Sequence, residues 1–269
     1  MEAEQSGVND VHLGGGRRPG SAARVGFVDQ LGTVLAAHRA YLRGWDPAPG
    51  ADPDLVTYRS DVPHATLNGV LRLRDRPAGD ALREARARLD GVPRIWWVGP
   101  DSDPGTSAAL QGAGAVKRTE LPIMVADLIE APKQPPETAG LEITRATDLV
   151  EYATAYGRVS GVDPAAIDTV VERERAQPDV VRLAGRGPDG TVAGTATAWF
   201  SHDIVTLYFV GTQPAHRRQG VGAAMTAAVL DLARQRGVTT AALSATPMAV
   251  SLYHRLGFRQ VGAFDILSF

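Results

Sequence analysis

The chain has 269 residues, of which 44% are hydrophobic and 22% are charged, and its formal net charge is −2. This composition is typical of a folded globular protein, and the charge gives no reason to expect a nucleic acid or an anionic membrane as a partner. The sequence contains no cysteine, which excludes disulfides, thiolate metal sites and a cysteine acyl intermediate.

The chain begins with a polar, glycine-rich stretch over residues 1–24, which we expect to be a disordered tail. This stretch lacks the apolar core of a signal peptide, and no apolar run elsewhere is long enough to cross a bilayer. We therefore expect a cytoplasmic protein with no membrane partner.

Residues 25–130 form the first predicted domain, in the order helix, two strands, helix, strand, helix, strand. Apolar residues at helical spacing, from Phe27 to Trp45, predict a helix over 27–45. Further helices are predicted at 80–89 and 104–111, and strands at 55–59, 70–73, 94–98 and 121–128. The proline-rich segment 131–139 is predicted to be a linker.

Residues 140–269 form the second predicted domain. Strands are predicted at 141–145, 180–184, 192–200, 204–210, 239–244 and within 258–269. Helices are predicted from Thr147 to Val159, after Asp163, over 221–236, and from Pro247 to Gly257, with Thr147, Asp163 and Thr246 as caps. Pro188-Asp189-Gly190 predicts a hairpin turn between two of the strands.

The most informative stretch lies between the strand that ends at Val210 and the helix that begins at Val221. It carries the pattern Arg217-x-x-Gly220-x-Gly222. The first amides of a helix lack intrahelical acceptors, and glycines let the oxygens of a ligand approach them. Arginines are disfavoured at a helix N-terminus, so a pair of them there favours a bound anion over the alternative of a solvated basic turn.

This loop resembles the acetyl-coenzyme A signature of the GNAT N-acetyltransferases, Arg/Gln-x-x-Gly-x-Gly/Ala. Farther along the chain, a second set of residues matches that family's Ala-x-x-Leu-Tyr-x-x-x-Gly-Phe pattern, namely Ala249, Leu252, Tyr253, Gly257 and Phe258. The resemblance covers residues 140–269 and implies the mixed α/β GNAT fold, a central twisted sheet flanked by helices.

The two predicted domains also resemble each other. Pro104 lies ten residues before Gly114, and Pro247 lies ten residues before Gly257, in each case after a predicted buried strand. We therefore expect two tandem GNAT-like domains, the first of them degenerate. The connector 74–79 has no Gly-x-Gly pattern, and Leu110 stands where Tyr253 stands in the second domain, so we expect one coenzyme per chain, bound within 140–269.

The resemblance implies an N-acetyltransferase that uses acetyl-CoA and no metal, and transfers the acetyl group directly, in a ternary complex, to a primary amine of a small molecule. It implies that Tyr253 is the acid that protonates the departing thiolate; the alternative is a tyrosine that only packs in the core. The coenzyme-binding residues that it implies are Val210, Gly211, Thr212, Arg217, Arg218, Gln219, Gly220, Val221, Gly222, Ala223 and Thr246. Of these, Thr246 stands where relatives often carry asparagine.

The general base is not identified by the sequence. Relatives often carry a glutamate on the central strand, but the predicted strand 204–210 has no carboxylate. His202 and Asp203 are the nearest candidates, with surface turn residues as the alternative. Two other functions stay open, a protein or peptide N-acetyltransferase and a non-catalytic acyl-CoA-binding regulatory module. The sequence also leaves open whether the chain is a monomer or a homodimer.

Overall fold

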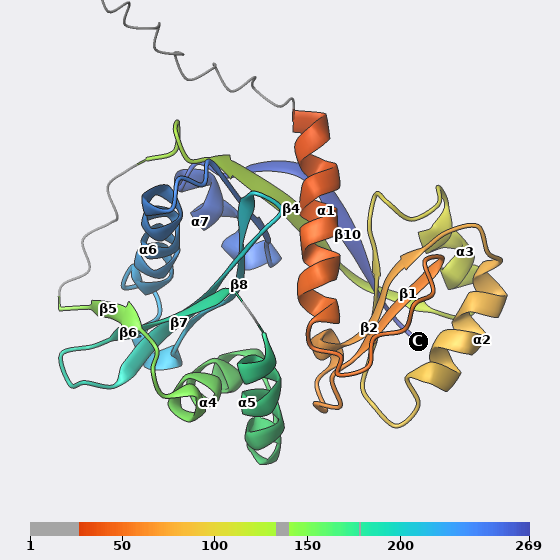
Figure 1. Cartoon of the computed structure of the whole chain (residues 1–269), viewed down its shortest axis with the longest axis horizontal. Helices are drawn as coiled ribbons and strands as arrows, with labels where there is room; N and C mark the ends of the chain where they lie inside the picture. The colour runs from red at the N-terminus through yellow and green to blue at the C-terminus, as the bar shows by residue number, and fades with distance from the viewer. Residues whose placement is uncertain (1–26, 133–139, 178) are drawn as a thin grey trace, which may run out of the picture.

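The structure is a computed structural model that describes residues 27–132, 140–177 and 179–269 (Figure 1). The predicted tail over 1–24 lies outside these residues, as does most of the predicted linker over 131–139. Below, residues 27–132 are called the first half and residues 140–269 the second half.

The strands of the described residues all join one ten-stranded sheet. In chain order they are β1 (Leu55–Arg59), β2 (Asn68–Leu73), β3 (Ile95–Val98), β4 (Val116–Asp127), β5 (Glu142–Arg145), β6 (Val180–Arg186), β7 (Val192–Ser201), β8 (Ile204–Thr212), β9 (Thr240–Ser244) and β10 (Arg259–Ser268). Their order across the sheet is β1-β2-β3-β10-β4-β9-β8-β7-β6-β5. The neighbouring pairs β2–β3 and β8–β9 are parallel, and the other pairs are antiparallel.

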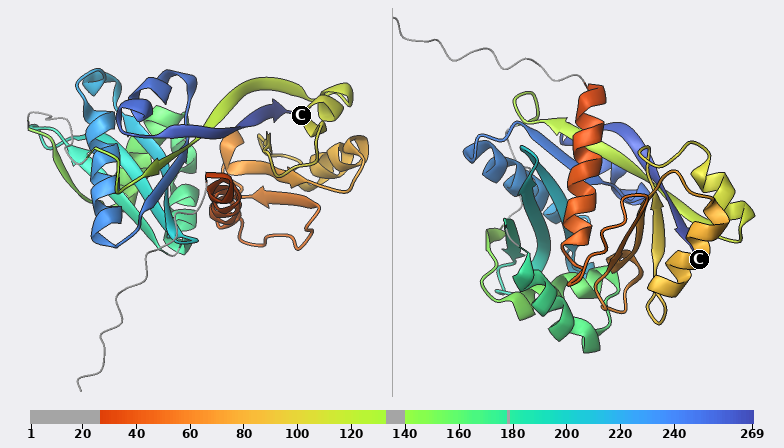
Figure 2. Two further views of the ribbon diagram at one scale, coloured as in Figure 1. Left: turned by 90° about the horizontal axis from the view of Figure 1, so that it is seen from above. Right: turned by 45° about the vertical axis from the view of Figure 1, so that its right-hand side comes forward.

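The two halves exchange their closing strands. β4, the last strand of the first half, pairs with β9 of the second half, while β10, the last strand of the second half, pairs with β3 and β4. Figure 2 shows β4 and β10 running together from one half into the other. The two halves therefore share a single sheet.

Helices cover both faces of this sheet. They are α1 (Phe27–Arg43), α2 (Ala78–Arg88), α3 (Thr106–Gly112), α4 (Leu149–Ser160), α5 (Ile167–Ala176), α6 (Val221–Gln235) and α7 (Val250–Arg255). The halves share the order strand, helix, strand, helix, strand, in β2–α2–β3–α3–β4 and in β8–α6–β9–α7–β10. The helix α1 stands between the two halves (Figure 1) and contacts both β8 and β10.

Three clusters of buried apolar side chains hold these layers together. One lies between the sheet and α6 and α7, and includes Met225 and Phe258. A second lies in the first half under α2 and α3. The third joins α1, α4 and α5 to the opposite face of the sheet and contains residues of both halves, for example Tyr41 and Tyr156. The buried surface is therefore continuous from one half to the other.

The predicted fold is confirmed, with corrections at the ends of elements. The helix α4 is capped by Asp148, whose side chain accepts from the amides of Val150 and Glu151, so the prediction of Thr147 as its cap was wrong. Thr246 stands at the N-cap position of a short 3-10 turn, Pro247–Ala249, but its side chain makes no capping hydrogen bond. The predicted cap Asp163 does accept from the amide of Ala165.

Candidate active site

The sheet splits between β8 and β9. These parallel strands pair from Val205–Ala241 to Leu207–Leu243, and the pairing stops there although β8 continues to Thr212. Beyond the split β8 stays with β7, and β9 stays with β4. No strand of the described residues pairs with the freed edge of β8 from Tyr208 onward. Such an edge can accept an extended ligand as an additional strand.

A β-bulge lies in β8 directly after the split begins. Thr197 of β7 faces Tyr208 and Thr195 faces Gly211, so that Phe209 and Val210 together oppose one residue, Ala196. Phe209 has a φ of +47°, in the left-handed region. A bulky residue in this conformation costs on the order of 1–3 kcal/mol, and bulges of this kind are frequent beside active sites.

The segment after β8 leads to the N-terminus of α6. The first amide of the helix with an intrahelical acceptor is that of Ala224, which donates to Gly220 O at 3.0 Å. The amides of Val221, Gly222 and Ala223 therefore have no acceptor within the helix, and no side chain of the described residues accepts from them. Together with the helix dipole, they form a site suited to a phosphate group.

Glycine stands at positions 220 and 222 of the loop for two different structural reasons. Gly220 has a φ of +83°, which favours glycine for conformational reasons alone. A Cβ on Gly222 would meet only Thr212 Oγ1 at 3.5 Å and Leu252 Cδ2 at 3.6 Å, which are ordinary contact distances. The fold therefore tolerates a side chain at position 222, and a glycine there leaves its amide open to a ligand.

Arg217, Arg218 and Gln219 lie exposed on the loop that precedes α6. Neither arginine takes part in an ion pair between described residues. Arg218 has a φ of +66°, so the loop turns sharply just before the helix. Two unpaired guanidinium groups beside free helix amides make this region strongly attractive to an anion.

Tyr253 lies on α7 on the same face of the sheet as α6. Its ring is buried, 6% exposed, and meets Phe258 edge to face at 5.6 Å. Burial raises the pKa of Tyr253 to about 12. No hydrogen bond joins its hydroxyl to another described residue, so the group is free to donate to a ligand. Thr246, in the segment between β9 and α7, is exposed.

The two candidates for a base lie at the wrong end of β8. His202 and Asp203 form the turn between β7 and β8, both are exposed, and their φ values of +54° and +59° are typical of a tight hairpin turn. They stand at the start of β8, whereas the split and the bulge lie near its end. The structure therefore favours surface turn residues, the alternative reading of the sequence.

Aromatic residues that no sequence pattern indicated cover the bulge. Tyr41 of α1 stacks on Tyr208 with a ring separation of 3.7 Å and an angle of 12°. Tyr156 of α4 stacks on Phe209 at 4.5 Å, and Trp45, just after α1, meets Phe209 at 5.8 Å. These partners come from distant parts of the chain, and no local spacing could have identified them.

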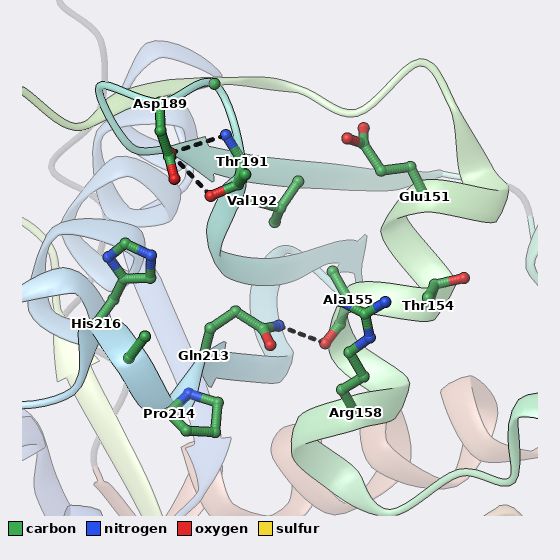
Figure 3. A pocket seen from close by; sticks show the side chains of 12 residues that line it. Glu151, Thr154, Ala155, Arg158, Asp189, Thr191, Val192, Gln213, Pro214 and His216 are labelled. Atoms are coloured by element: carbon green, nitrogen blue, oxygen red, sulfur yellow. Dashed lines mark hydrogen bonds between the residues drawn. The ribbon is translucent and has the colours of Figure 1, made fainter.

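A groove adjoins the loop on the other side of β8. It has a volume of about 770 Å³ and lies between α4, the turn joining β6 to β7, and the segment that follows β8 (Figure 3). Gln213 Nε2 donates to Ala155 O at 2.6 Å across its base. No residue of β8 or β9 lines the groove, so it is separate from the split between these two strands.

The corresponding cleft of the first half is filled by the chain itself. The parallel pairing of β2 with β3 ends at Val70–Trp96, as that of β8 with β9 ends at Leu207–Leu243. Beyond it, the amide of Leu73 donates to Ser102 Oγ at 3.3 Å, and its carbonyl accepts from the amide of Asp103 at 3.1 Å. The edge of β2 is thus occupied where the edge of β8 is free.

The described part of the chain, residues 27–132, 140–177 and 179–269, lacks two features. No helix there has the length and apolarity needed to span a bilayer. In the same residues, no three histidine or carboxylate side chains gather as potential metal ligands.

Comparisons with known proteins agree with this geometry. Residues 148–258 match the model of the acetyltransferase (GNAT) family. The mycothiol acetyltransferase of Clavibacter michiganensis subsp. michiganensis is 29% identical over 209 residues, which cover 72% of this chain and 67% of that protein.

Solved structures are similar across both halves. A GCN5-related N-acetyltransferase from Kribbella flavida has a TM-score of 0.67 at 22% identity, over 87% of this chain and 94% of that one. A tandem GNAT protein from the clavulanic acid biosynthesis pathway has a TM-score of 0.56 at 16% identity, over 80% of this chain and 78% of that one.

The family match spans the loop before α6 and the helix that carries Tyr253. The similarity of fold extends through the first half, as the coverage of the solved structures requires. Enzymes of this family use acetyl-CoA. The resemblance noted in the sequence is therefore confirmed: residues 148–258 match the acetyltransferase (GNAT) family, and the protein is an acyltransferase.

Proposed function

We propose that this enzyme transfers the acetyl group of acetyl-CoA to a primary amine of a small molecule, by direct transfer in a ternary complex. One observation carries the proposal. The free edge of β8 leads directly into the unpaired amides at the start of α6. An extended arm followed by a pyrophosphate, as in coenzyme A, matches these two features in order along the chain.

The residues at the split fit the coenzyme. The backbone of Val210, Gly211 and Thr212 pairs with the pantetheine arm along the free edge of β8. The pyrophosphate is held by the amides of residues 220–223 and by the side chains at 217–219. Thr246, exposed beside the start of α7, completes the proposed contacts.

Tyr253 supplies the acid. As the neutral amine nitrogen bonds to the acetyl carbon and the carbon–sulfur bond breaks, the hydroxyl of Tyr253 donates its proton to the departing sulfur. The nitrogen releases a proton to solvent to become the amide, and solvent returns a proton to Tyr253. The raised pKa of Tyr253, about 12, keeps the hydroxyl protonated throughout the neutral range. The buried ring, fixed against Phe258, holds the donor in one place.

The acceptor amine is one that deprotonates easily. No carboxylate lies on β8, and His202 and Asp203 stand at its far end. At pH 7 a lysine-like amine is neutral in about one molecule in 2,500, but an α-amine is neutral in about one in seven. An enzyme whose central strand carries no carboxylate is therefore suited to the second kind of amine. Efficient acetylation of a lysine side chain at pH 7 contradicts this assignment.

We further propose that residues 140–269 form the catalytic domain, and that residues 25–130 form a degenerate domain joined to it by the linker 131–139. The occupied edge of β2 supports this division, because Ser102 and Asp103 take the place where a second pantetheine arm would pair. The buried Leu110, which cannot donate a proton, supports it as well.

The loop is tested with a matched pair of variants at the two ends of α6. Gly220→Asp places a carboxylate beside the phosphates, and we expect it to weaken acetyl-CoA binding by about tenfold to several hundredfold. Gly237 has a similar φ of +74° and is exposed after the other end of the helix, so Gly237→Asp is the control. Calorimetry measures the Kd of acetyl-CoA for both folded variants. An unchanged Kd for Gly220→Asp removes the loop from the site.

The reaction is tested by release of free thiol from acetyl-CoA in the presence of a panel of small amines. We expect release to depend on an amine of low pKa. Slow thioester hydrolysis with no stimulation by any amine indicates a binding module instead. Acetylated peptides detected by mass spectrometry, without activity on small amines, indicate a protein acetyltransferase.

A further inference from the structure

We propose that α1 and the residues that follow it act as a positioning element of the active site, because Tyr41 and Trp45 hold β8 in its bulged conformation. This inference rests on the proposed function for its meaning, since the bulge lies where β8 opens toward the pantetheine arm. It assigns a role in the reaction to the first half, although that half has no free cleft of its own.

The bulge requires support. Phe209 adopts a left-handed φ of +47°, which is unfavourable for a bulky side chain. Such conformations persist only where the surrounding structure fixes them. If the support is removed, β8 can relax toward an ordinary extended strand, and the backbone groups from Val210 to Thr212 then shift along the free edge.

Aromatic contacts fix the bulge from two sides. Tyr156 stacks on Phe209 with an angle of 19°, and it belongs to α4 of the second half. The other contacts come from the first half, where Trp45 meets Phe209 edge to face and Tyr41 stacks on Tyr208, the residue just before the bulge. Ring contacts of these types contribute a favourable free energy in addition to that from the apolar area that they bury.

The supporting residues are themselves rigidly held. Tyr41 and Trp45 are 1% and 0% exposed, respectively. Gln177, just after α5, donates from Nε2 to Tyr41 O at 3.4 Å. His38 Nδ1 lies 3.4 Å from the hydroxyl of Tyr208, one turn of α1 before Tyr41. The helix α1 thus contacts both halves of the molecule. Its position therefore determines the positions of Tyr208 and Phe209.

The backbone of β8 also has a contact that does not involve α1. Thr195 Oγ1 of β7 donates to Phe209 O at 3.0 Å. This bond fixes the carbonyl from the β7 side and does not depend on the first half. Loss of the α1 contacts is therefore expected to distort the pantetheine edge without disrupting the sheet or the start of α6.

The experiment separates the two parts of the coenzyme. Calorimetry measures the Kd of acetyl-CoA and of 3′-phosphoadenosine 5′-diphosphate, which lacks the pantetheine arm. For Tyr41→Leu we expect acetyl-CoA to bind about tenfold more weakly while the Kd of the nucleotide stays within about twofold of wild type. We expect kcat to fall at least about tenfold. Tyr41→Phe, which keeps the ring, is expected to keep both Kd values and kcat close to those of the wild type.

Trp96→Leu is the control. Trp96 is fully buried in the first half under α2 and α3, away from β8, so its truncation reports general destabilisation of that half. A Tyr41→Leu variant that binds acetyl-CoA as wild type does overturns the proposal. So does one that weakens both ligands equally, or one whose effects are matched by Trp96→Leu.

A second measurement does not depend on the coenzyme. Hydrogen exchange of the amides of β8 in the free protein is expected to be faster in Tyr41→Leu than in Trp96→Leu, and to be normal in Tyr41→Phe. If Tyr41→Leu fails to fold, Trp45→Phe is measured in the same way. Unchanged exchange in β8 refutes the positioning role. A wild-type protein that binds neither ligand refutes the proposed function and leaves the exchange measurement to decide the role of α1.

Discussion

The buried histidine in α1 should make the stability of this protein fall in mildly acidic solution. His38 is 5% exposed, and its ring lies 4.9 Å from the ring of Trp97 and 4.7 Å from that of Phe264. Burial, and to a smaller extent the charge of Arg39, lowers the pKa of His38 from 6.5 to about 3. The folded protein therefore keeps this imidazole neutral at pH values where the unfolded chain protonates it.

The sign and size of the effect follow from this difference. Above pH 6.5 neither state binds the proton, so the stability is fully present. As the pH falls toward 3, only the unfolded state takes up the proton, and the free energy of unfolding decreases. At about 1.36 kcal/mol for each pH unit below 6.5, the loss at pH 5 is about 2 kcal/mol.

The assay is urea denaturation of the wild type and of His38→Gln at pH 7.5 and pH 5. We expect the wild type to lose about 2 kcal/mol more than the variant over this interval, because the variant has no imidazole at position 38 to protonate. His202→Gln, which replaces an exposed histidine, serves as the control and should follow the wild type. If His38→Gln loses as much stability as the wild type, the buried neutral imidazole is not the cause.

Three further predictions concern the active site. Tyr253→Phe should lower kcat by about 10²–10⁴ and leave the Kd of acetyl-CoA unchanged, and a change in kcat below about threefold when chemistry limits the rate makes Tyr253 structural. Because an acid must be protonated and the pKa of Tyr253 is about 12, kcat/KM should show no decline from its ionisation below about pH 11, which a pH profile with a non-titrating acceptor measures. A calorimetric titration should give one acetyl-CoA per chain; two sites contradict the closure of the first cleft by Ser102 and Asp103.

Local signals were sufficient for the elements and for the loop before α6. The hairpin at Pro188-Asp189-Gly190 and the cap at Asp163 depend on residues a few positions apart, and both were predicted. The same holds for Arg217-x-x-Gly220-x-Gly222, in which a strand, a turn and a helix follow one another directly. These features depend on short-range geometry, which residue spacing records.

Features that depend on distant partners were not predictable. The spacing predicts the strand 204–210 but not its bulge, because nothing in Tyr208 and Phe209 indicates a bulge that packing from α1 and α4 stabilises. Trp45 was noted only as part of an apolar stripe, and Tyr41 was not singled out. The pairing of β4 with β9 was also missed, because hydrophobic pattern identifies a strand without identifying its neighbour in a sheet.

The exchange of closing strands has a consequence for folding during synthesis. β10 is made after every other element described, yet it lies between β3 and β4 of the first half. While the ribosome is still translating the second half, the edges of β3 and β4 that later pair with β10 are exposed. Exposed strand edges promote aggregation and the binding of chaperones. The aromatic ring of Phe269 then packs at 5.4 Å from Trp96 and under Arg94. Neither half can complete its part of the shared sheet until residues 259–268 have left the exit tunnel, so the two halves finish folding together.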